Sequence, residues 1–518
     1  MTSQQTASRP SANPYDAIVY AAQPHHETAP DNLGALGLLL GLDPAPPERC
    51  RFLEIGCATG GNLFNLAEAY PGSQFIGLDP SARQIGIARQ VADAFGFANL
   101  RFECLGAEAL DDSWGKFDYI VSHGVYSWVP PAVREAILAS SKRLLAPHSI
   151  AYVSYNAKPG FHLRQPVREM MIWHVRDIPD PMERVAQARA ILSFLSENAP
   201  HKDSAWCHLL REEAELALPR TDFYLAHEHL EGVNEGFYFH EFLAAARRHG
   251  LEYLAEAAYH TNTNGLPPEA RQAVEAMSED LPALEQYVDF LKGRMFRRTL
   301  LVHPDAPVNR KPRPGILARL HFSGLAKPSV EVVPIGTPET VEFKNDEGGA
   351  VDTNRPVLKA ALVELYERWP LAVSWDDLWM GTASKLSASG IEPTEEGRAV
   401  LASSLASLML SNLVQFHAGP SPFVTHLSDT PKASRLARAQ AVGDATVCNR
   451  RHRRTDLDGF GKLLLPLLDG TRDRDALILE LLKHVDPSKA TPEEARERIE
   501  ADLGPSLERL AQTALLIG

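Results

Sequence analysis

The sequence predicts an α/β fold in the N-terminal part of the chain, followed by a mostly helical C-terminal region. Short apolar runs alternate with helical segments from residue 51 onward, a pattern typical of a parallel sheet with helices on both faces. After residue 315 the apolar residues recur instead at helical spacing, as in PVLKAALVELYERWP at 356–370. With 518 residues the chain is also too long for one compact domain.

The strand candidates of the sheet occur in two groups. The first group runs from RFLEIG at 51–56 through QFIGLD, LRFECLG and FDYIVSHG to SIAYVSYN at 149–156. The second group, LEYLAEA at 251–257 and RMFRRTLLVH at 294–303, follows a helix-rich stretch from about 161 to 222. We therefore predict one sheet that is interrupted in sequence by a helical insertion.

The segment LEIGCATGGN at 53–62 carries the strongest functional signal. An apolar strand runs into a loop with Gly56 and Gly60, where the missing side chains let a ligand approach the backbone. The helix beyond the loop offers unpaired N–H groups to a carboxylate or a phosphate. Asp79 ends the next strand, about 20 residues later, where an acid can accept hydrogen bonds from ribose hydroxyls; capping the following helix is the alternative. The spacing does not match the GxGxxG dinucleotide pattern, and the lysine of a P-loop is missing.

A family resemblance rests on several of these segments. LEIGCATGGN together with GLDPS at 77–81 resembles the first two motifs of class I S-adenosylmethionine-dependent methyltransferases. SHGVYSWVP at 122–130, YVSYNAKPG at 152–160, YFHEFLAAARRHGLEYLAEA at 238–257 and LLDGTRDRDAL at 467–477 are similar to members that carry a methyltransferase regulatory domain. Bacterial enzymes that methylate lysines of outer-membrane proteins belong to that group. The resemblance implies a Rossmann-like core and S-adenosyl-L-methionine as cofactor.

The resemblance also implies which residues bind the cofactor. The glycine loop would hold the methionine part and Asp79 the ribose, while Ala107 and Glu108 occupy the adenine-binding turn, with Ala107 where an Asp is common. The candidates in the loop are Gly56, Cys57, Ala58 and Gly60. Residues in or next to the motifs are further candidates for binding the cofactor: Glu54, Asn62, Pro80, Ser81 and His123. Near the N-terminus, Tyr15, Tyr20 and His25 could fold over the cofactor as a lid.

The acceptor candidates follow the fourth and fifth predicted strands, whose carboxyl ends face the ligand crevice. We expect catalytic roles for His123, Tyr126 and Asn156. His123 could take a proton, orient the acceptor or only line the cofactor, and Asn156 resembles the position where amino-methylating enzymes place an Asn. Trp128 and Tyr155 are expected to contact the acceptor, although packing in the core explains Trp128 equally well.

The predicted regions follow from these assignments. Residues 307–315, PVNRKPRPG, look like a linker, so we expect the C-terminal half to be a separable folding unit. The helix–turn–helix pattern at 460–485 resembles a winged helix, a fold that often binds protein. The five regions are an N-terminal cap or lid (1–48), the Rossmann-like core (49–156), the helical insertion (157–222), the remainder of the core (223–306) and a winged-helix-like region (315–518).

Composition narrows the classes of partner. The formal net charge of −14 disfavours nucleic acid, so we expect none, and it tolerates a cationic substrate. The five cysteines are scattered and form no CxxC pair, which predicts a reducing compartment and no zinc module. Without an HExxH or a GxSxG motif, the sequence also gives no support to a metal site or to serine-hydrolase chemistry. The sequence shows neither a signal peptide nor an apolar stretch long enough to span a membrane, which predicts a cytoplasmic protein. Two basic clusters, around Arg297 and around His452, are interpreted as solvated surface, with nucleic-acid contact as the alternative.

Three hypotheses for function follow. The chain is a protein-lysine methyltransferase, a small-molecule methyltransferase such as one for a secondary metabolite, or a binding protein that uses the cofactor for regulation. Intact Gly56, Gly60 and Asp79 favour an enzyme. The large C-terminal half, which would recognise substrate or mediate homodimer contacts, favours a protein acceptor, and lysine is the acceptor that we expect.

Overall fold

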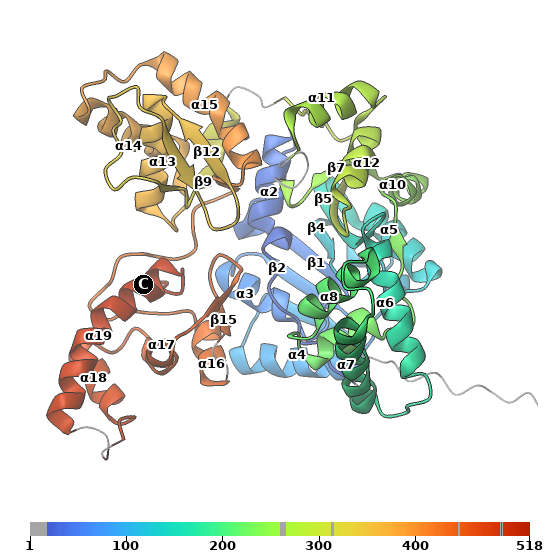
Figure 1. Ribbon diagram of the computed structural model, residues 1–518. Helices are drawn as coiled ribbons and strands as arrows, with labels where there is room; N and C mark the ends of the chain where they lie inside the picture. Colours follow the sequence, from blue (N-terminus) through green and yellow to red (C-terminus); the bar gives the residue numbers. More distant parts are fainter. Residues whose placement is uncertain (1–17, 260–265, 312–314, 444–445, 487, 489–490) are drawn as a thin grey trace, which may run out of the picture.

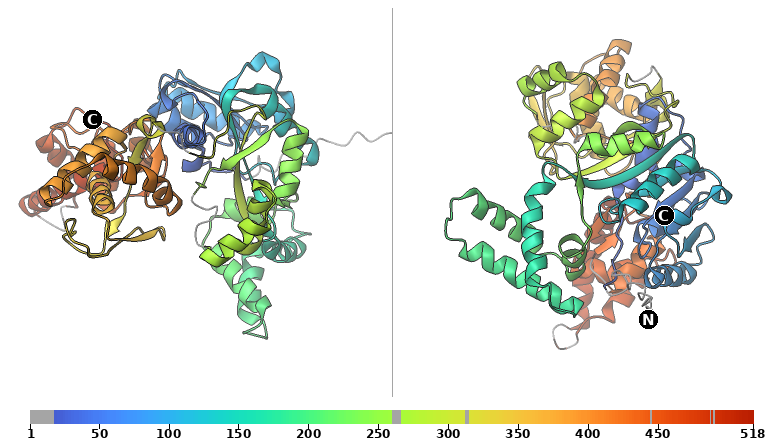
Figure 2. Two further views of the ribbon diagram at one scale, coloured as in Figure 1. Left: turned by 90° about the horizontal axis from the view of Figure 1, so that it is seen from above. Right: turned by 90° about the vertical axis from the view of Figure 1, so that its right-hand side faces the viewer.

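The molecule is arranged around one large sheet, which lies between a helical insertion and a C-terminal half made of two smaller units (Figure 1). The computed structural model describes residues 18–259, 266–311, 315–443, 446–486, 488 and 491–518. Figure 2 shows that the C-terminal half lies to one side of the sheet and that the insertion helices project away from it.

The central sheet has the strand order β3-β2-β1-β4-β5-β8-β7, and β6 pairs with the end of β5. Strands β1 to β5 run parallel, as their alternation with helices predicted, whereas β8 inserts antiparallel between β5 and β7 and makes the whole sheet mixed. The apolar runs are buried on both faces of the sheet, as expected for strands covered by helices. The strands are β1 (Arg51–Ile55), β2 (Gln74–Leu78), β3 (Leu100–Glu103), β4 (Phe117–Ser122), β5 (Leu145–Ala157), β6 (Gly236–Phe237), β7 (Glu252–Glu256) and β8 (Phe296–Val302).

The helices of the sheet domain begin where the sequence supplies turn and capping residues. Gly60, with φ of +79°, closes the turn before α3, a backbone conformation that favours glycine. Ser81 caps α4 by accepting a hydrogen bond from the backbone N–H of Gln84 at 3.2 Å. The helices are α3 (Gly61–Ala69), α4 (Ala82–Phe95), α5 (Pro131–Leu144), α10 (Phe239–Arg248), α11 (Pro268–Met277) and α12 (Leu281–Lys292).

The insertion has a small core of its own. Helices α6 (Phe161–His174), α7 (Pro181–Asn198) and α8 (Ala205–Ala217) pack their apolar faces together around residues such as Met171 and Leu192. The chain returns to the sheet through α9 (Asp222–Tyr224) and a single π-helical turn at Leu225–His229. Such turns are rare and occur frequently at functional sites.

The C-terminal half contains more strand than the sequence indicated. Its first unit packs three helices on two small antiparallel sheets of order β13-β9-β14 and β10-β11-β12. These elements are β9 (His321–Ser323), β10 (Lys327–Pro328), β11 (Val341–Lys344), β12 (Ala350–Thr353), α13 (Pro356–Arg368), β13 (Val373–Ser374), α14 (Trp375–Ala388), α15 (Glu395–Leu410) and β14 (Gln415–His417). The second unit consists of α16 (Arg435–Gly443), the hairpin β15 (Thr446–Cys448) and β16 (Arg454–Asp456), α17 (Gly459–Leu464), α18 (Arg474–Leu482) and α19 (Pro492–Gln512).

The two halves of the chain share a hydrophobic core. Leu38 and Leu39 of α2 (Pro30–Leu39) are buried together with residues 320–416 of the C-terminal half. The predicted linker is also packed, because the Asn309 N–H donates to the carbonyl of Leu40 at 2.7 Å. This shared core argues against the expected separable C-terminal half, since removing that half would expose one face of α2. Among the described residues, no helix is both long and apolar enough to cross a bilayer.

Candidate active site

A cavity of about 510 Å³ opens at the carboxyl ends of the parallel strands. Gly56, Asp79 and His123 directly follow β1, β2 and β4, and Asn156 lies at the end of β5; all four line the cavity. The volume lies within the range of about 300–1,000 Å³ that is usual for small-molecule and cofactor sites. Parallel strand ends thus bring four residues that are distant in sequence to one site, as predicted.

The glycine loop forms one wall of the cavity. Gly56 has φ of +80°, and a Cβ added there would lie 2.3 Å from Cγ2 of Val125, so only glycine fits. Cys57 and Ala58 line the cavity beside it. Gly60 does not line the cavity, since a Cβ there would meet the ring of Phe102 at 2.5 Å; its role is to close the turn before α3.

Glu54 presents a carboxylate to the cavity. The side chain is buried, its Oε1 accepts a hydrogen bond from Asn62 Nδ2 at 2.9 Å, and its Oε2 has no hydrogen-bond partner among the described residues. Burial raises the pKa of Glu54 to about 8. An orphaned buried carboxylate oxygen requires a donor from elsewhere, and an ammonium group such as that of the methionine part of S-adenosylmethionine would supply one.

Asp79 is fixed by the loop on either side of it. Its Oδ2 accepts from the Ala58 N–H at 3.0 Å and its Oδ1 from the Ser81 N–H at 2.9 Å. Pro80 lines the cavity, whereas Ser81 is buried as the cap of α4. The residues present thus fit the predicted cofactor, with a glycine cradle, a buried carboxylate on each side and a helix N-terminus beyond.

The predicted adenine-binding turn does not reach this cavity. Ala107 is buried in the core beneath the sheet, and Glu108 is exposed on the short 3₁₀ turn at Ala107–Ala109. Neither residue lines the cavity. Their direct cofactor contact is therefore not supported by the geometry, because the turn directs one residue inward to the core and the other to solvent.

An N-terminal segment lies across the cofactor side of the cavity. Backbone N–H groups of this segment donate to three side chains of the sheet domain: Tyr20 to Gln84 Oε1 at 3.2 Å, Ala22 to Thr59 Oγ1 at 3.1 Å and His25 to Asn62 Oδ1 at 2.9 Å. Tyr20, Ala22 and His25 line the cavity. The segment therefore sits where the lid was predicted, and Tyr15 lies outside the described residues.

His123 is held as a neutral ring between two neighbours. Its ring lies against that of His25, tilted by 32° with 3.8 Å between centroids, and its Nδ1 lies 2.7 Å from the Tyr152 hydroxyl. Burial, with contributions from His25 and Arg298, lowers the pKa of His123 well below its usual value. A neutral histidine with one nitrogen already engaged fits a lining role better than that of a proton acceptor.

The opposite wall is formed by the end of β5, the insertion and the π-helical turn. The Asn156 side chain donates to Asn234 Oδ1 at 2.6 Å, and Trp128 also lines the cavity. Sequence reasoning missed the other residues of this wall, because no motif marks the insertion or the turn. These residues are Arg164, Tyr224, His227 and Glu228.

Tyr126 and Tyr155 are core residues rather than site residues. Tyr155 is 0% exposed, stacks on Phe242 at 4.1 Å between centroids and places its hydroxyl 3.3 Å from Thr299 Oγ1. Tyr126 is buried in the same aromatic cluster, with its ring edge-on to Phe237 and Phe242. The geometry therefore does not support the predicted catalytic role of Tyr126 or the acceptor role of Tyr155, because neither residue lines the cavity.

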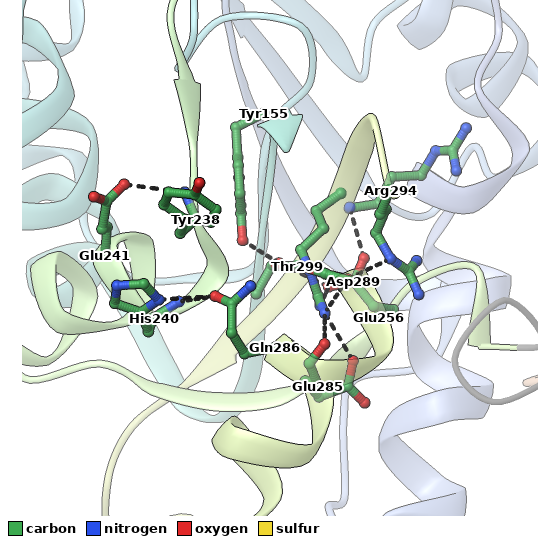
Figure 3. A network of polar contacts seen from close by, with 12 residues as sticks. Tyr155, Tyr238, His240, Glu241, Glu256, Glu285, Gln286, Asp289, Arg294 and Thr299 are labelled. Atoms are coloured by element: carbon green, nitrogen blue, oxygen red, sulfur yellow. Dashed lines mark hydrogen bonds and ion pairs between the residues drawn. The ribbon is translucent and has the colours of Figure 1, made fainter. Parts of the chain in front are cut away.

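The first basic cluster is not a solvated surface. Arg297 is 0% exposed and its guanidinium bonds Glu256 at 2.7 Å, Glu285 at 2.9 Å and Asp289 at 2.8 Å. Figure 3 shows these three acidic partners lying close together. Arg294 pairs with the same Asp289 at 2.7 Å, and Thr299 joins Tyr155 to Glu256. This buried network ties α12 to β7 and β8 behind the site. Breaking such a network by removing one partner typically destabilises a protein by about 3–5 kcal/mol.

The second basic cluster connects the C-terminal hairpin to the cavity. Arg450 is buried and pairs with Glu68 at 3.2 Å. His452 is buried as well, and its Nε2 lies 2.8 Å from Oδ1 of Asn62, a cavity residue. The interpretation of this cluster as solvated is therefore wrong for both residues, which form an interface within the chain.

Models of three protein families match the chain. "Methyltransferase domain" matches residues 52–148, "Predicted methyltransferase regulatory domain" matches 221–303, and "PKMT, C-terminal winged helix domain" matches 429–515. The resemblance to methyltransferases that carry a regulatory domain is confirmed by these matches. The winged-helix resemblance is likewise confirmed, over the second C-terminal unit.

Individual relatives agree with the family models. An uncharacterized protein of Rickettsia prowazekii is 33% identical over 523 residues, covering 98% of this chain and 94% of its own length. The structure of PKMT2 from Rickettsia typhi in complex with AdoHcy matches with a TM-score of 0.85 and 29% identity, covering 96% of this chain and 100% of that one. A ubiquinone biosynthesis O-methyltransferase of Rhizobium rhizogenes is 33% identical over 117 residues, which is 22% of this chain and 45% of that protein.

Proposed function

We propose that this protein, which belongs to the S-adenosylmethionine-dependent methyltransferases with a regulatory domain and a PKMT-type winged-helix domain, transfers methyl groups to lysine side chains of a protein. The similarity to a solved PKMT2 over nearly the whole chain supports a protein acceptor. The observation that carries the choice of an amine is the wall opposite the glycine loop. It combines the aromatic side chains of Trp128 and Tyr224 with the carboxylate of Glu228, a lining suited to a cationic side chain.

We assign the two walls to the two substrates. Gly56, Ala58 and Asp79, with Glu54 for the ammonium group, would hold S-adenosylmethionine, which supplies a methyl group on a positively charged sulfur when bound. Trp128 and Asn156 would orient the acceptor between the walls. Burial lowers the pKa of His25 to about 4 and that of His123 well below its usual value, so neither ring would add a positive charge beside the sulfonium.

The chain must also make the acceptor nucleophilic. A lysine ammonium has a reference pKa near ~10.4, so deprotonation at pH 7 requires roughly 4–5 kcal/mol. Burial of the amine between aromatic side chains lowers that requirement by disfavouring its charged form. Alignment of the amine with the methyl group supplies much of the remaining rate enhancement.

The test is transfer of label from S-adenosyl-[methyl-³H]methionine to poly-L-lysine. We expect counts in the polymer, N-methyl-lysine on amino-acid analysis, and loss of both with Asp79→Ala. Label that enters only small molecules of a bacterial extract, or methyl groups found on oxygen or carbon, would contradict the lysine proposal and leave the methyltransferase activity standing.

A further inference from the structure

We propose that Glu228 receives the acceptor amine and takes its proton before methyl transfer. This inference rests on the proposed lysine acceptor and names the residue that would deprotonate it. It is carried by the position of Glu228 in the cavity, by the bonds that hold its backbone, and by the lack of a partner for its carboxylate.

The backbone of Glu228 is fixed next to the acceptor wall. Glu228 lies on the π-helical turn Leu225–His229, and its carbonyl accepts from Arg168 at 2.8 Å and from Asn234 Nδ2 at 3.0 Å. Asn234 in turn accepts from the side chain of Asn156 at 2.6 Å. Three hydrogen bonds therefore lock the turn against the end of β5, with the side chain of Glu228 on the cavity surface.

The carboxylate of Glu228 has no hydrogen-bond partner among the residues that the structure describes. Arg164, a cation that lines the same cavity, is already paired with Glu213 at 2.8 Å, and Glu213 also bonds His229 at 2.9 Å. A carboxylate that is partly withdrawn from water without a directly bonded cation is unfavourable unless a ligand supplies one. A lysine ammonium is a compact cation that fits this requirement, and the acidic net charge of −14 favours its approach.

Of the titratable groups on this side of the cavity, Glu228 has the pKa that suits proton exchange near neutral pH. Burial raises the pKa of Glu228 to about 7, Arg164 and Arg168 oppose the rise, and Glu213 adds to it. From the facing elements, burial raises the pKa of Tyr20 to about 12 and also raises that of Tyr224, so both hydroxyls keep their protons. Burial lowers the pKa values of His227 and His229, which favours their neutral forms.

The proposed step is balanced in atoms and charge. The acceptor ammonium gives one proton to the Glu228 carboxylate, which leaves a neutral amine and a carboxylic acid. The amine lone pair forms the new N–CH₃ bond while the C–S bond of S-adenosylmethionine breaks. The electron pair of the C–S bond stays on sulfur, which gives S-adenosylhomocysteine. The product is an N-methylammonium, and Glu228 returns its proton to solvent.

The test compares Glu228→Gln with Glu231→Gln, using poly-L-lysine as acceptor. Glu231 lies in the same segment and its carbonyl accepts from the same Arg168, but its side chain does not line the cavity. We expect kcat to fall about 100- to 1,000-fold for Glu228→Gln, the usual contribution of a general base, and to change less than about 2-fold for Glu231→Gln. Calorimetry with S-adenosylhomocysteine should give an unchanged Kd for both variants.

The pH profile separates proton transfer from a structural role. In the wild type, kcat should rise with pH through the Glu228 titration and then level off. In Glu228→Gln it should keep rising toward the pKa of free lysine, because only amine deprotonated in solution can react. A variant that is merely misfolded would not recover at high pH. Glu228→Asp keeps a carboxyl group, so its kcat should show the same rise and plateau with pH as the wild type, at a lower maximal value.

Each other outcome overturns a distinct statement. Full turnover by Glu228→Gln would exclude its role as base while leaving lysine as the acceptor. Weakened binding of S-adenosylhomocysteine in parallel with turnover would place Glu228 in the cofactor subsite. Equal loss in Glu231→Gln, or a lowered Tm without recovery by Glu228→Asp, would make the turn a structural element. A wild type that does not label poly-L-lysine would overturn the proposed function, and this inference with it.

Discussion

The contact between the winged-helix hairpin and the cofactor wall allows a sharp test, replacement of His452 by alanine. His452 is buried between β15 and β16 with φ of +57°, a conformation that costs a non-glycine residue about 1–2 kcal/mol. Its Nδ1 lies 3.2 Å from Asn65 Nδ2, which donates, so Nε2 carries the proton and donates to Asn62 Oδ1 at 2.8 Å. The hydrogen bond from His452 orients the side-chain amide of Asn62, whose Nδ2 in turn donates to Glu54 at 2.9 Å.

The expected magnitude follows from these bonds. Two buried hydrogen bonds contribute about 1 kcal/mol each, and leaving polar groups of Asn62 and Asn65 unsatisfied adds to the loss, so His452→Ala should destabilise the folded state by roughly 2–4 kcal/mol. If about 1 kcal/mol of this is transmitted through Asn62 to Glu54, the Kd for S-adenosylhomocysteine rises about 5-fold. Burial lowers the pKa of His452 to about 3 and raises that of Glu54 to about 8, so neither group titrates between about pH 5 and about pH 6.5, and the fold-change should be the same at these two pH values.

The assay is calorimetry with S-adenosylhomocysteine at both pH values, with the melting temperature measured in parallel. The control is Asp456→Asn, because Asp456 is exposed in the same hairpin and its carboxylate accepts from Thr446. A lower Tm with an unchanged Kd would show that the hairpin supports the fold without affecting the cofactor wall. A fold-change that differs between the two pH values would refute the assignment of His452 as a neutral donor.

Three further outcomes are expected. Asp79→Ala should raise the Kd for S-adenosylhomocysteine about 10- to 100-fold in calorimetry, since charge-assisted hydrogen bonds contribute about 1.5–3 kcal/mol; binding within about 2-fold of the wild type would exclude Asp79 as a cofactor ligand. Tyr155→Phe should keep kcat on poly-L-lysine and lower Tm by only a few degrees, whereas a selective loss of kcat would restore its acceptor role. A fragment of residues 1–311 should aggregate or fail to bind cofactor on size-exclusion and calorimetry, because Leu38 and Leu39 lose their cover.

The strands of the sheet were predictable because they are buried on both faces and therefore appear as continuous apolar runs bounded by polar turns. RFLEIG and FDYIVSHG each end one residue or two beyond the observed strand, where the glycine and histidine of the site begin. The strands β9 to β14 were not predictable, because each has only two to four residues and such a length shows no alternation. Their pairing depends on partners from distant parts of the chain.

The site was predictable where a local motif fixes the backbone, and not where side-chain direction decides. Successive residues of a strand face opposite sides, so Asn156 lines the cavity while its neighbour Tyr155 enters the core. The same alternation places Arg298 on the cavity and Arg297 among buried carboxylates. Glu228 was missed because its position depends on a turn that is held by residues from two other elements.

The cavity is lined by residues between Tyr20 and Arg298, and Asn62 is the lining residue at which the N-terminal segment and the C-terminal hairpin meet. Its Oδ1 accepts both the backbone N–H of His25 from the N-terminal segment and the imidazole of His452 from the winged-helix hairpin. Its Nδ2 donates to Glu54, the carboxylate that we assign to the cofactor ammonium. Because one amide has a single carbonyl oxygen, displacing either partner changes the hydrogen bonding of the other. Closure of the N-terminal segment, docking of the hairpin and cofactor affinity are therefore expected to be coupled through this residue, which gives the C-terminal half a direct physical connection to methyl transfer.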